Sequence, residues 1–209
     1  MPLQNRVTPF GEIVAHPARG TLMGNRGGCL HDEGKRLRRR RWVTERWITC
    51  LLEFRGWHRE VMRPGYYTEL FFLDEATALA AGHRPCAECR HADFKRFRQA
   101  WLAGNPGAGL TPESSISAID LVLHAERCSP DWAKRTFEAP LGQLPDGVMV
   151  AAGSQAFVQW RQQLLQWSFS GYGEPLVADP GRTMTVLTPP STVRAIGAGY
   201  RPAVHQSAK

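Results

Sequence analysis

A Cys-x-x-Cys pair placed directly after a short helix is the feature that most constrains how this chain can fold. The helix is expected over residues 74–82, because Asp74 is a favoured N-cap residue and Gly82 a favoured residue for ending a helix. Cys86 and Cys89 follow, and two thiolates at this spacing can bind one Zn²⁺ while the turn between them aims backbone N–H groups at the sulfurs. A redox pair of this spacing normally opens a helix that follows a strand. The position after a helix therefore favours metal binding over redox chemistry or two incidental thiols.

A closed tetrahedral zinc site needs two more Cys or His ligands. The first choice is Cys29 with His31, because both lie in a glycine-rich loop that can fold tightly around an ion. Cys50 is the second choice, since it sits in an apolar run where a buried free thiol is the usual outcome. His83 and His91 flank the pair, and His91 is close enough in sequence to reach the ion. We therefore expect a Zn²⁺ site formed by Cys86, Cys89, His31 and Cys29.

The cysteine count and the N-terminus predict a cytoplasmic protein with no membrane segment. The chain has 209 residues and five cysteines, an odd number. The residues after Met1 contain no apolar signal-peptide core, and no run of eighteen apolar residues occurs. In a reducing compartment, cysteines at this spacing bind metals more often than they form structural disulfides.

A dense basic run predicts a polyanionic partner. The formal net charge is +7, and six of the seven residues from Lys35 to Arg41 are cationic. Arginines bind phosphates through paired hydrogen bonds and release counterions, and clustered cations repel one another unless an anion is present. Trp42, Trp47 and Trp57 interleave with the charges, although burial in a hairpin core is the more common fate of such side chains. We expect nucleic acid, with DNA as the favoured polymer, to be bound by Arg36, Arg38, Arg39, Arg40, Arg41 and Arg90.

The hydrophobic pattern predicts an α+β fold in two domains. In the N-terminal half, strands are expected at 47–54 and 66–73, a hairpin partner at 58–62 and a helix at 92–102. The glycine-rich stretch 104–109 predicts a boundary between a basic zinc-binding domain at 1–104 and a β-rich domain at 105–209. A helix at 117–127 opens the second domain, strands follow at 148–150, 156–160, 164–169 and 184–187, and a short helix after Pro189 closes it. Residues 157–167 also fit one amphipathic helix, but the flanking glycines favour a hairpin.

Three further groups of residues are candidates for a chemical role. Asp120, His124 and Arg127 share one helix face, with Glu126 nearby, where a surface row of ion pairs is a more common outcome than a catalytic group. Cys128 follows Arg127, which could lower the pKa of the thiol. Residues 25–28 form either a nest of N–H donors for an anion or a plain tight turn.

The segment from Glu69 to Arg90 resembles the metal-binding module of the Ada adaptive-response regulator and related small zinc domains. The resemblance rests on a strand, an alanine-rich helix and the sequence Gly-His-Arg-Pro-Cys-Ala-Glu-Cys at 82–89. It implies a four-ligand zinc site in a small α+β fold, contact with DNA and, in Ada itself, methyl transfer from a phosphotriester to a metal-bound cysteine. Cys86 and Cys89 match the family's second ligand pair, whereas no residue here matches its methyl-accepting cysteine. The whole chain also resembles a family of bacterial proteins built around this knuckle.

Three functional hypotheses follow. The leading one is a nucleic-acid-binding protein in which a structural zinc staples an N-terminal hairpin and helix, followed by a β-rich half. The second is a metal-dependent enzyme whose zinc has three protein ligands and one open position, with Asp120, His124 or Glu126 nearby. The third is a structural or regulatory adaptor in which zinc only stabilises the fold.

Overall fold

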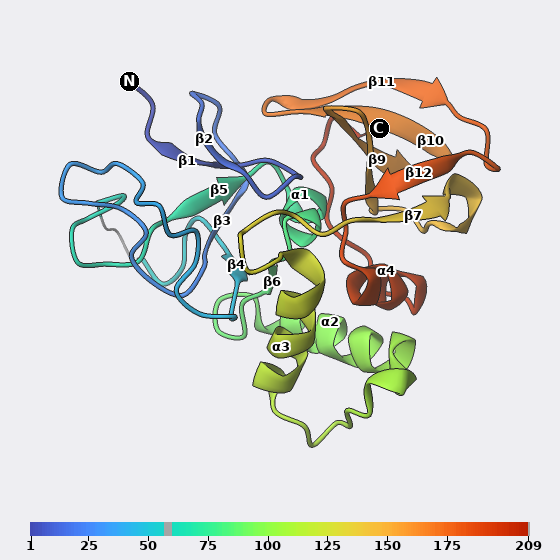
Figure 1. Cartoon of the computed structure of the whole chain (residues 1–209), viewed down its shortest axis with the longest axis horizontal. Helices are drawn as coiled ribbons and strands as arrows, with labels where there is room; N and C mark the ends of the chain where they lie inside the picture. The colour runs from blue at the N-terminus through green and yellow to red at the C-terminus, as the bar shows by residue number, and fades with distance from the viewer. Residues whose placement is uncertain (57–59, 209) are drawn as a thin grey trace.

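The computed structural model describes residues 1–56 and 60–208. In this part of the chain, two six-stranded sheets lie beside each other, and the three longer helices gather below them (Figure 1). The architecture is therefore mixed α and β, and the expected β-rich C-terminal half is confirmed.

The N-terminal sheet is larger than the three-stranded unit expected for this region. Its strands have the order β2-β1-β5-β3-β4-β6. Their bounds are β1 Gln4–Val7, β2 Ile13–Ala15, β3 Leu22–Asn25, β4 Ile48–Cys50, β5 Leu70–Phe72 and β6 Arg84–Pro85. The strands expected at 47–54 and 66–73 appear as β4 and β5, both shorter. Of the expected hairpin partner, residues 58 and 59 lie outside the described residues and residues 60–62 are in no strand.

The two faces of this sheet have different environments, because successive side chains of a strand point to opposite sides. One face is packed in the core, with the buried residues Val7, Gly24, Thr49, Leu70 and Phe72. The other face lines a cavity with the alternate residues Arg6, Met23, Asn25, Ile48, Cys50 and Phe71. The side chains on this second face are therefore available to form a binding site.

Helix α1, Glu75–Ala80, anchors the C-terminal segment to the N-terminal half. As expected, Asp74 caps the helix, because its Oδ1 accepts hydrogen bonds from Thr77 N at 2.9 Å and Thr77 Oγ1 at 2.7 Å. The other carboxylate oxygen of Asp74 accepts from Tyr172 Oη at 2.7 Å and from His205 N at 2.9 Å. Glu75 accepts from Tyr200 Oη at 2.5 Å and Ala203 N at 2.9 Å. Two buried carboxylates thus hold the chain end against this helix.

The C-terminal sheet is mostly an antiparallel meander with the order β11-β10-β9-β8-β12-β7. Its strands are β7 Phe137–Pro140, β8 Met149–Ala152, β9 Gln155–Trp160, β10 Gln163–Ser168, β11 Gly171–Val177 and β12 Thr183–Val186. Strands β9 and β10 pair antiparallel with Trp160 opposite Gln163, so the hairpin interpretation of residues 157–167 is confirmed. Strands β7 and β11 are additional to the strands expected from the sequence.

Three helices pack in one hydrophobic cluster with the C-terminal sheet. They are α2 His91–Gly104, α3 Ile116–Arg127 and α4 Pro190–Gly197, close to the helices expected at 92–102, at 117–127 and after Pro189. Phe97 and Trp101 of α2 share one hydrophobic cluster with Val148, Val150 and other residues of the C-terminal half. Residues on both sides of the expected boundary at 104/105 therefore contribute to a common core.

Candidate metal centre

Three cysteines, one at the end of strand β4 and two in the segment after β6, meet on the open face of the N-terminal sheet. The sulfurs of Cys50, Cys86 and Cys89 all lie within 4.8 Å of one another. Strands β4 and β6 pair in parallel, with Thr49 opposite Pro85, and Cys86 N donates to Thr49 O at 2.8 Å. This pairing brings Cys86, the residue after Pro85, beside Cys50, the residue after Thr49. The strand register thus adds Cys50 to the Cys-x-x-Cys pair.

The turn between Cys86 and Cys89 has the geometry of a metal-binding knuckle. Glu88 N lies 3.4 Å from Cys86 Sγ and donates a hydrogen bond to it, and Arg90 N donates to Cys86 O at 3.3 Å. Backbone N–H groups directed at a sulfur stabilise its thiolate form, which is the form that binds metals. A hydrogen bond from the Cys50 thiol lowers the pKa of Cys86 to about 2, and the same bond raises the pKa of Cys50. The cluster can therefore hold negative charge.

This donor set fits a thiophilic metal ion. Soft thiolate ligands select Zn²⁺ and related ions over Mg²⁺ or Ca²⁺, which prefer oxygen. Cys50, Cys86 and Cys89 supply three of the four positions that a tetrahedral zinc site requires. The coarser expectation of a metal-binding cysteine cluster thus has support in the fold.

Buried ion pairs fix the polypeptide on both sides of the knuckle. Before it, Arg84 donates two hydrogen bonds to Asp120 of α3, Nε to Oδ1 and Nη2 to Oδ2, each at 2.7 Å. After it, Arg90 Nη2 lies 2.7 Å from Glu75 Oε1 and 2.8 Å from Asp93 Oδ2. Neither arginine is accessible, since Arg84 is 2% and Arg90 is 6% exposed. This burial argues against the nucleic-acid contact expected for Arg90.

Among the described residues, the cysteine cluster contains neither Cys29 nor His31. Both nitrogens of His31 are engaged elsewhere, with Nδ1 2.7 Å from Thr68 Oγ1 and Nε2 3.2 Å from Arg63 O. Cys29 Sγ lies 3.7 Å from His31 Nδ1, so these two residues contact each other rather than the knuckle. The sequence ranked Cys50 below them because an apolar strand usually buries an inert thiol. The parallel pairing of β4 with β6, which sequence reasoning missed, is what brings Cys50 to the knuckle.

All three thiols line one cavity of about 620 Å³. Its wall also contains Arg6 and Arg19 together with Glu53, Glu69 and Glu88, so charges of both signs line the cavity. The Arg6 guanidinium lies 4.8 Å from the ring centroid of Phe71, and burial together with the nearby Arg19 lowers its pKa. A cavity of this size is ordinary for a small-molecule site.

A buried carboxylate also lines this cavity. Glu69 is 2% exposed; its Oε2 accepts from Met62 N at 2.8 Å, while its Oε1 has no hydrogen-bond partner among the described residues. An unpartnered buried oxygen costs free energy, so such atoms tend to have a functional role. Sequence reasoning missed Glu69. A signal was present, because a Glu inside an apolar strand segment is unusual in a protein interior.

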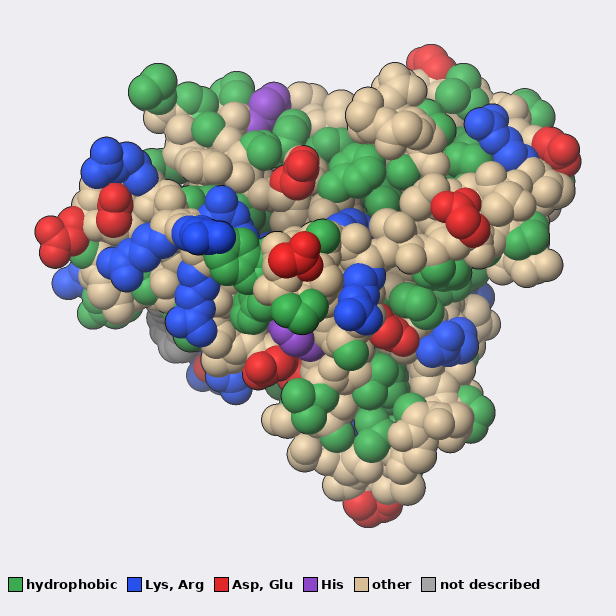
Figure 2. All heavy atoms as spheres, in the orientation of Figure 1, with side chains coloured by type: hydrophobic (Ala, Val, Ile, Leu, Met, Phe, Trp, Pro, Cys, Tyr) green, Lys and Arg blue, Asp and Glu red, His purple; other side chains and the backbone are tan. Residues whose placement is uncertain are grey.

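The basic run forms part of the molecular surface. Arg36, Arg38, Arg39 and Arg40 are exposed, and Arg41 is half-buried. Figure 2 shows Lys and Arg side chains gathered on the side of the molecule formed by the N-terminal half. Arg36 pairs with Asp32 at 3.3 Å, and Arg40 donates to the backbone oxygens of Trp42 and Val43. The run is therefore accessible, but part of it is held by local contacts.

The helix face of α3 has a structural role rather than the expected surface row. Asp120 is buried against Arg84, and Arg127 is 2% exposed with its Nη2 2.9 Å from His124 Nδ1. Glu126 caps α4 instead, accepting from Ser191 N at 2.9 Å. Arg127 and Cys128 line a second cavity of the protein, and none of the residues on this face lines the cavity of the cysteine cluster.

Neither a protein-family model nor a curated protein nor a solved structure matches this chain. In the part of the chain that the structure describes, no helix combines the length and apolar character needed to cross a bilayer.

Proposed function

We propose that this protein is a zinc-dependent enzyme that acts on a small substrate in the cavity beside Cys50, Cys86 and Cys89. The observation that carries this proposal is that all three thiols line one cavity together with the buried carboxylate of Glu69. A structural zinc site is normally closed by a fourth protein ligand, whereas a catalytic site leaves that position to water or substrate. Three thiols facing a cavity favour the second arrangement.

The residues of the chain have distinct roles in this proposal. Cys50, Cys86 and Cys89 hold the ion, which when bound supplies a Lewis acid for a carbonyl or phosphoryl oxygen. Glu69 acts as the general acid or base that exchanges a proton with the substrate, because its unpartnered Oε1 lies in a desolvated wall. Arg6 and Arg19 donate hydrogen bonds that orient the substrate.

Metal stoichiometry and ligand exchange test the proposal together. Elemental analysis should find one zinc per chain, lost in Cys50→Ser and in Cys86→Ser. Cys29→Ser and His31→Ala are matched controls that should keep the metal. In the Co²⁺-loaded protein, added azide or a small thiol should change the visible absorption bands, because an open position accepts an outside ligand.

Two results would contradict the proposal. Loss of zinc in Cys29→Ser or His31→Ala would restore the closed site expected from the sequence. Cobalt bands that do not respond to added ligands would indicate a closed structural site, as in an adaptor that uses zinc only for folding.

Nucleic-acid binding is a second candidate function, favoured by the four exposed arginines of the basic run. In this second function, the phosphates are contacted by Arg36, Arg38, Arg39 and Arg40, and Arg41 adds to the positive electrostatic potential. The affinity for short duplex DNA should then fall with salt, with a log–log slope of about −0.9 for each phosphate neutralised.

The matched variants for this test remove the same charge at different places. Arg38→Gln/Arg39→Gln should reduce the salt slope by about two units, whereas Arg161→Gln/Arg182→Gln, which changes exposed arginines of the C-terminal half, should not. An affinity that does not change with salt would exclude this function.

A further inference from the structure

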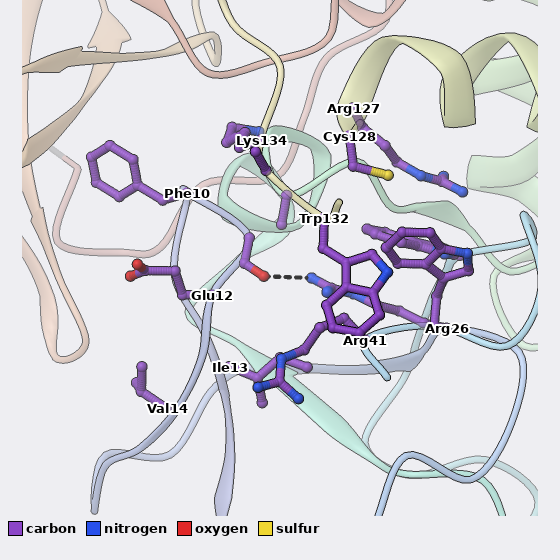
Figure 3. A pocket seen from close by; sticks show the side chains of 15 residues that line it. Phe10, Glu12, Ile13, Val14, Arg26, Arg41, Arg127, Cys128, Trp132 and Lys134 are labelled. Atoms are coloured by element: carbon purple, nitrogen blue, oxygen red, sulfur yellow. Dashed lines mark hydrogen bonds between the residues drawn. The ribbon is translucent and has the colours of Figure 1, made fainter. Parts of the chain in front are cut away.

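A second cavity, also of about 620 Å³, lies away from the cysteine cluster and shares no lining residue with it. It is formed where the β1–β2 turn meets the end of β3, the start of β4 and the segment after α3 (Figure 3). Four cationic side chains line it: Arg26, Arg41, Arg127 and Lys134. Neither the metal centre nor the exposed basic run accounts for this cluster.

Two of the cations are buried against one aromatic ring. Arg26 and Arg127 are 3% and 2% exposed, and their guanidinium carbons lie 4.0 Å and 3.9 Å from the ring centroid of Trp47. Such contacts stabilise a cation by a modest amount but leave its charge uncancelled. The ring therefore positions the two guanidinium groups without neutralising them.

None of the four cations forms an ion pair with a carboxylate within residues 1–56 and 60–208. Arg26 Nη2 donates to Gly11 O at 2.9 Å, Arg127 Nη1 to Gly82 O at 2.8 Å and Lys134 Nζ to Ala80 O at 2.6 Å. These acceptors are backbone carbonyls, which carry no net charge. Glu12 lines the cavity, but in Figure 3 its carboxylate points away from Arg26 and Arg41. Buried charges in proteins are normally paired with an opposite charge. These cations therefore lack the anionic partner that their burial calls for.

Other titratable groups in this region do not supply the missing charge. Burial raises the pKa of the Cys128 thiol, which stays neutral near pH 7. Burial and the nearby arginines lower the pKa of both His83 and His124. The cations themselves are in an unfavourable electrostatic environment. Burial and repulsion from neighbouring cations lower the pKa of Lys134 to about 7 and those of Arg26 and Arg127 to about 9. Arg127 Nε, moreover, is buried and has no hydrogen-bond partner among the described atoms.

Aromatic side chains line the cavity beside the cations. The rings of Trp42 and Trp132 lie 6.0 Å apart, and Trp132 is 37% exposed. An exposed tryptophan next to unpaired cations offers a flat surface on which an aromatic ring can stack. The backbone of Trp132 has φ 73, a left-handed conformation that large residues rarely adopt. Strain of this kind is concentrated at ligand sites.

From this geometry we propose that the second cavity binds a phosphate monoester that carries a flat aromatic ring, of the size of a mononucleotide. The phosphate is bound by Arg26, Arg127 and Lys134, and Arg41 adds a further positive charge beside it. Trp132 contacts the aromatic ring. Phosphate suits these donors because arginine forms paired, charge-assisted hydrogen bonds with its oxygens. The cavity volume lies in the ordinary range for ligands of this size.

Isothermal titration of the full chain with three probes tests this inference. AMP should bind more tightly than inorganic phosphate, because it adds the stacked ring, and adenosine should bind least, because it lacks the anion. Lys134→Met and Arg41→Ala should each weaken AMP binding about tenfold or more, which is the effect of losing one charge-assisted hydrogen bond. Arg182→Ala removes one exposed cation elsewhere and should leave the affinity unchanged.

A further variant separates the two parts of the site. Trp132→Gly suits the positive φ at this position. It should remove the advantage of AMP over phosphate while phosphate still binds. Thermal melts of every variant identify any loss of folding. The inference is overturned if neither AMP nor phosphate binds, or if Lys134→Met and Arg41→Ala bind AMP as the wild type does. Equal affinities for AMP and phosphate would overturn the role of the aromatic wall.

Discussion

Arg84 and Asp120 form an ion pair with two hydrogen bonds of 2.7 Å between strand β6 and helix α3, and both side chains are almost fully buried. Arg84 is two residues before Cys86, so this pair fixes the strand that leads into the turn with Cys86 and Cys89. Removing one partner of a buried ion pair leaves an uncompensated charge.

We expect Asp120→Ala to lower the free energy of unfolding by about 3–5 kcal/mol and to weaken zinc retention, measured by urea unfolding and metal competition. The double variant Arg84→Met/Asp120→Leu removes both charges and should recover much of the stability. A single variant as stable as the wild type would show that the pair does not hold the knuckle.

Removal of the metal should destabilise the protein through the same strands. Because Cys50 of β4 and Cys86 after β6 would share one ion, a chelator should lower the melting temperature of the zinc-loaded wild type. Cys50→Ser should melt at the lower temperature with or without chelator, while Cys29→Ser should still respond. A wild type that is insensitive to chelator after verified metal loss would contradict a stabilising site.

Asp74 accepts four hydrogen bonds, two from Thr77 of α1 and two from Tyr172 and His205 of the C-terminal half. Asp74→Ala should therefore cost more than the ~1 kcal/mol typical of a lost N-cap, because Tyr172 Oη and His205 N also lose their acceptor. Asp74→Asn keeps a capping oxygen and should cost less. Equal unfolding midpoints for the two variants would indicate that the tether to Tyr172 and His205, rather than capping, dominates.

Lys134 should make stability depend on pH. Its folded-state pKa of about 7 lies below the usual value of 10.5, since burial and the neighbouring Arg26 and Arg127 disfavour its charge. Between these two values the unfolded chain binds more protons, so stability from this residue rises as pH increases from 7 to 10.5 and is lost as pH falls.

We expect a gain on the order of 1 kcal/mol between pH 7 and pH 9, less than the ~2.7 kcal/mol of a full shift, because Lys134 is partly exposed. The measurement is the difference between wild type and Lys134→Met in urea at each pH. A difference that stays constant over this range would refute the assignment.

Gly82 ends α1 in a conformation that excludes a side chain. Its φ is +85, and an added Cβ would lie 2.4 Å from Arg127 Cδ, a clash with a buried residue. Gly199 also has a positive φ, of +111, but open space around it. Gly82→Ala should therefore destabilise by clearly more than the ~1 kcal/mol expected for Gly199→Ala from backbone strain alone. Similar melting temperatures would show that Arg127 moves aside at little cost.

Local sequence signals were sufficient for the elements whose formation depends on near neighbours. Asp74 as N-cap, the helix over residues 117–127 and the hairpin around Arg161 all follow from capping, periodicity and turn residues within a few positions. Strands β1 to β3 were missed because they are only three or four residues long, and β1 and β3 gain stability from pairing with the distant strand β5.

The same division holds for the candidate sites. The sequence alone was enough to single out Cys86 and Cys89 as a candidate metal-binding pair, because their spacing within one turn is a local property. Only the tertiary structure decided that Cys50 joins them and that His31 bonds to Thr68 instead, since the register of β4 against β6 sets that proximity. It also decided that Arg26, Arg127 and Lys134 meet in one cavity without forming an ion pair to any carboxylate of the described residues. Spacing fixes what adjacent residues can do together, but long-range strand pairing and burial select which distant side chains become neighbours.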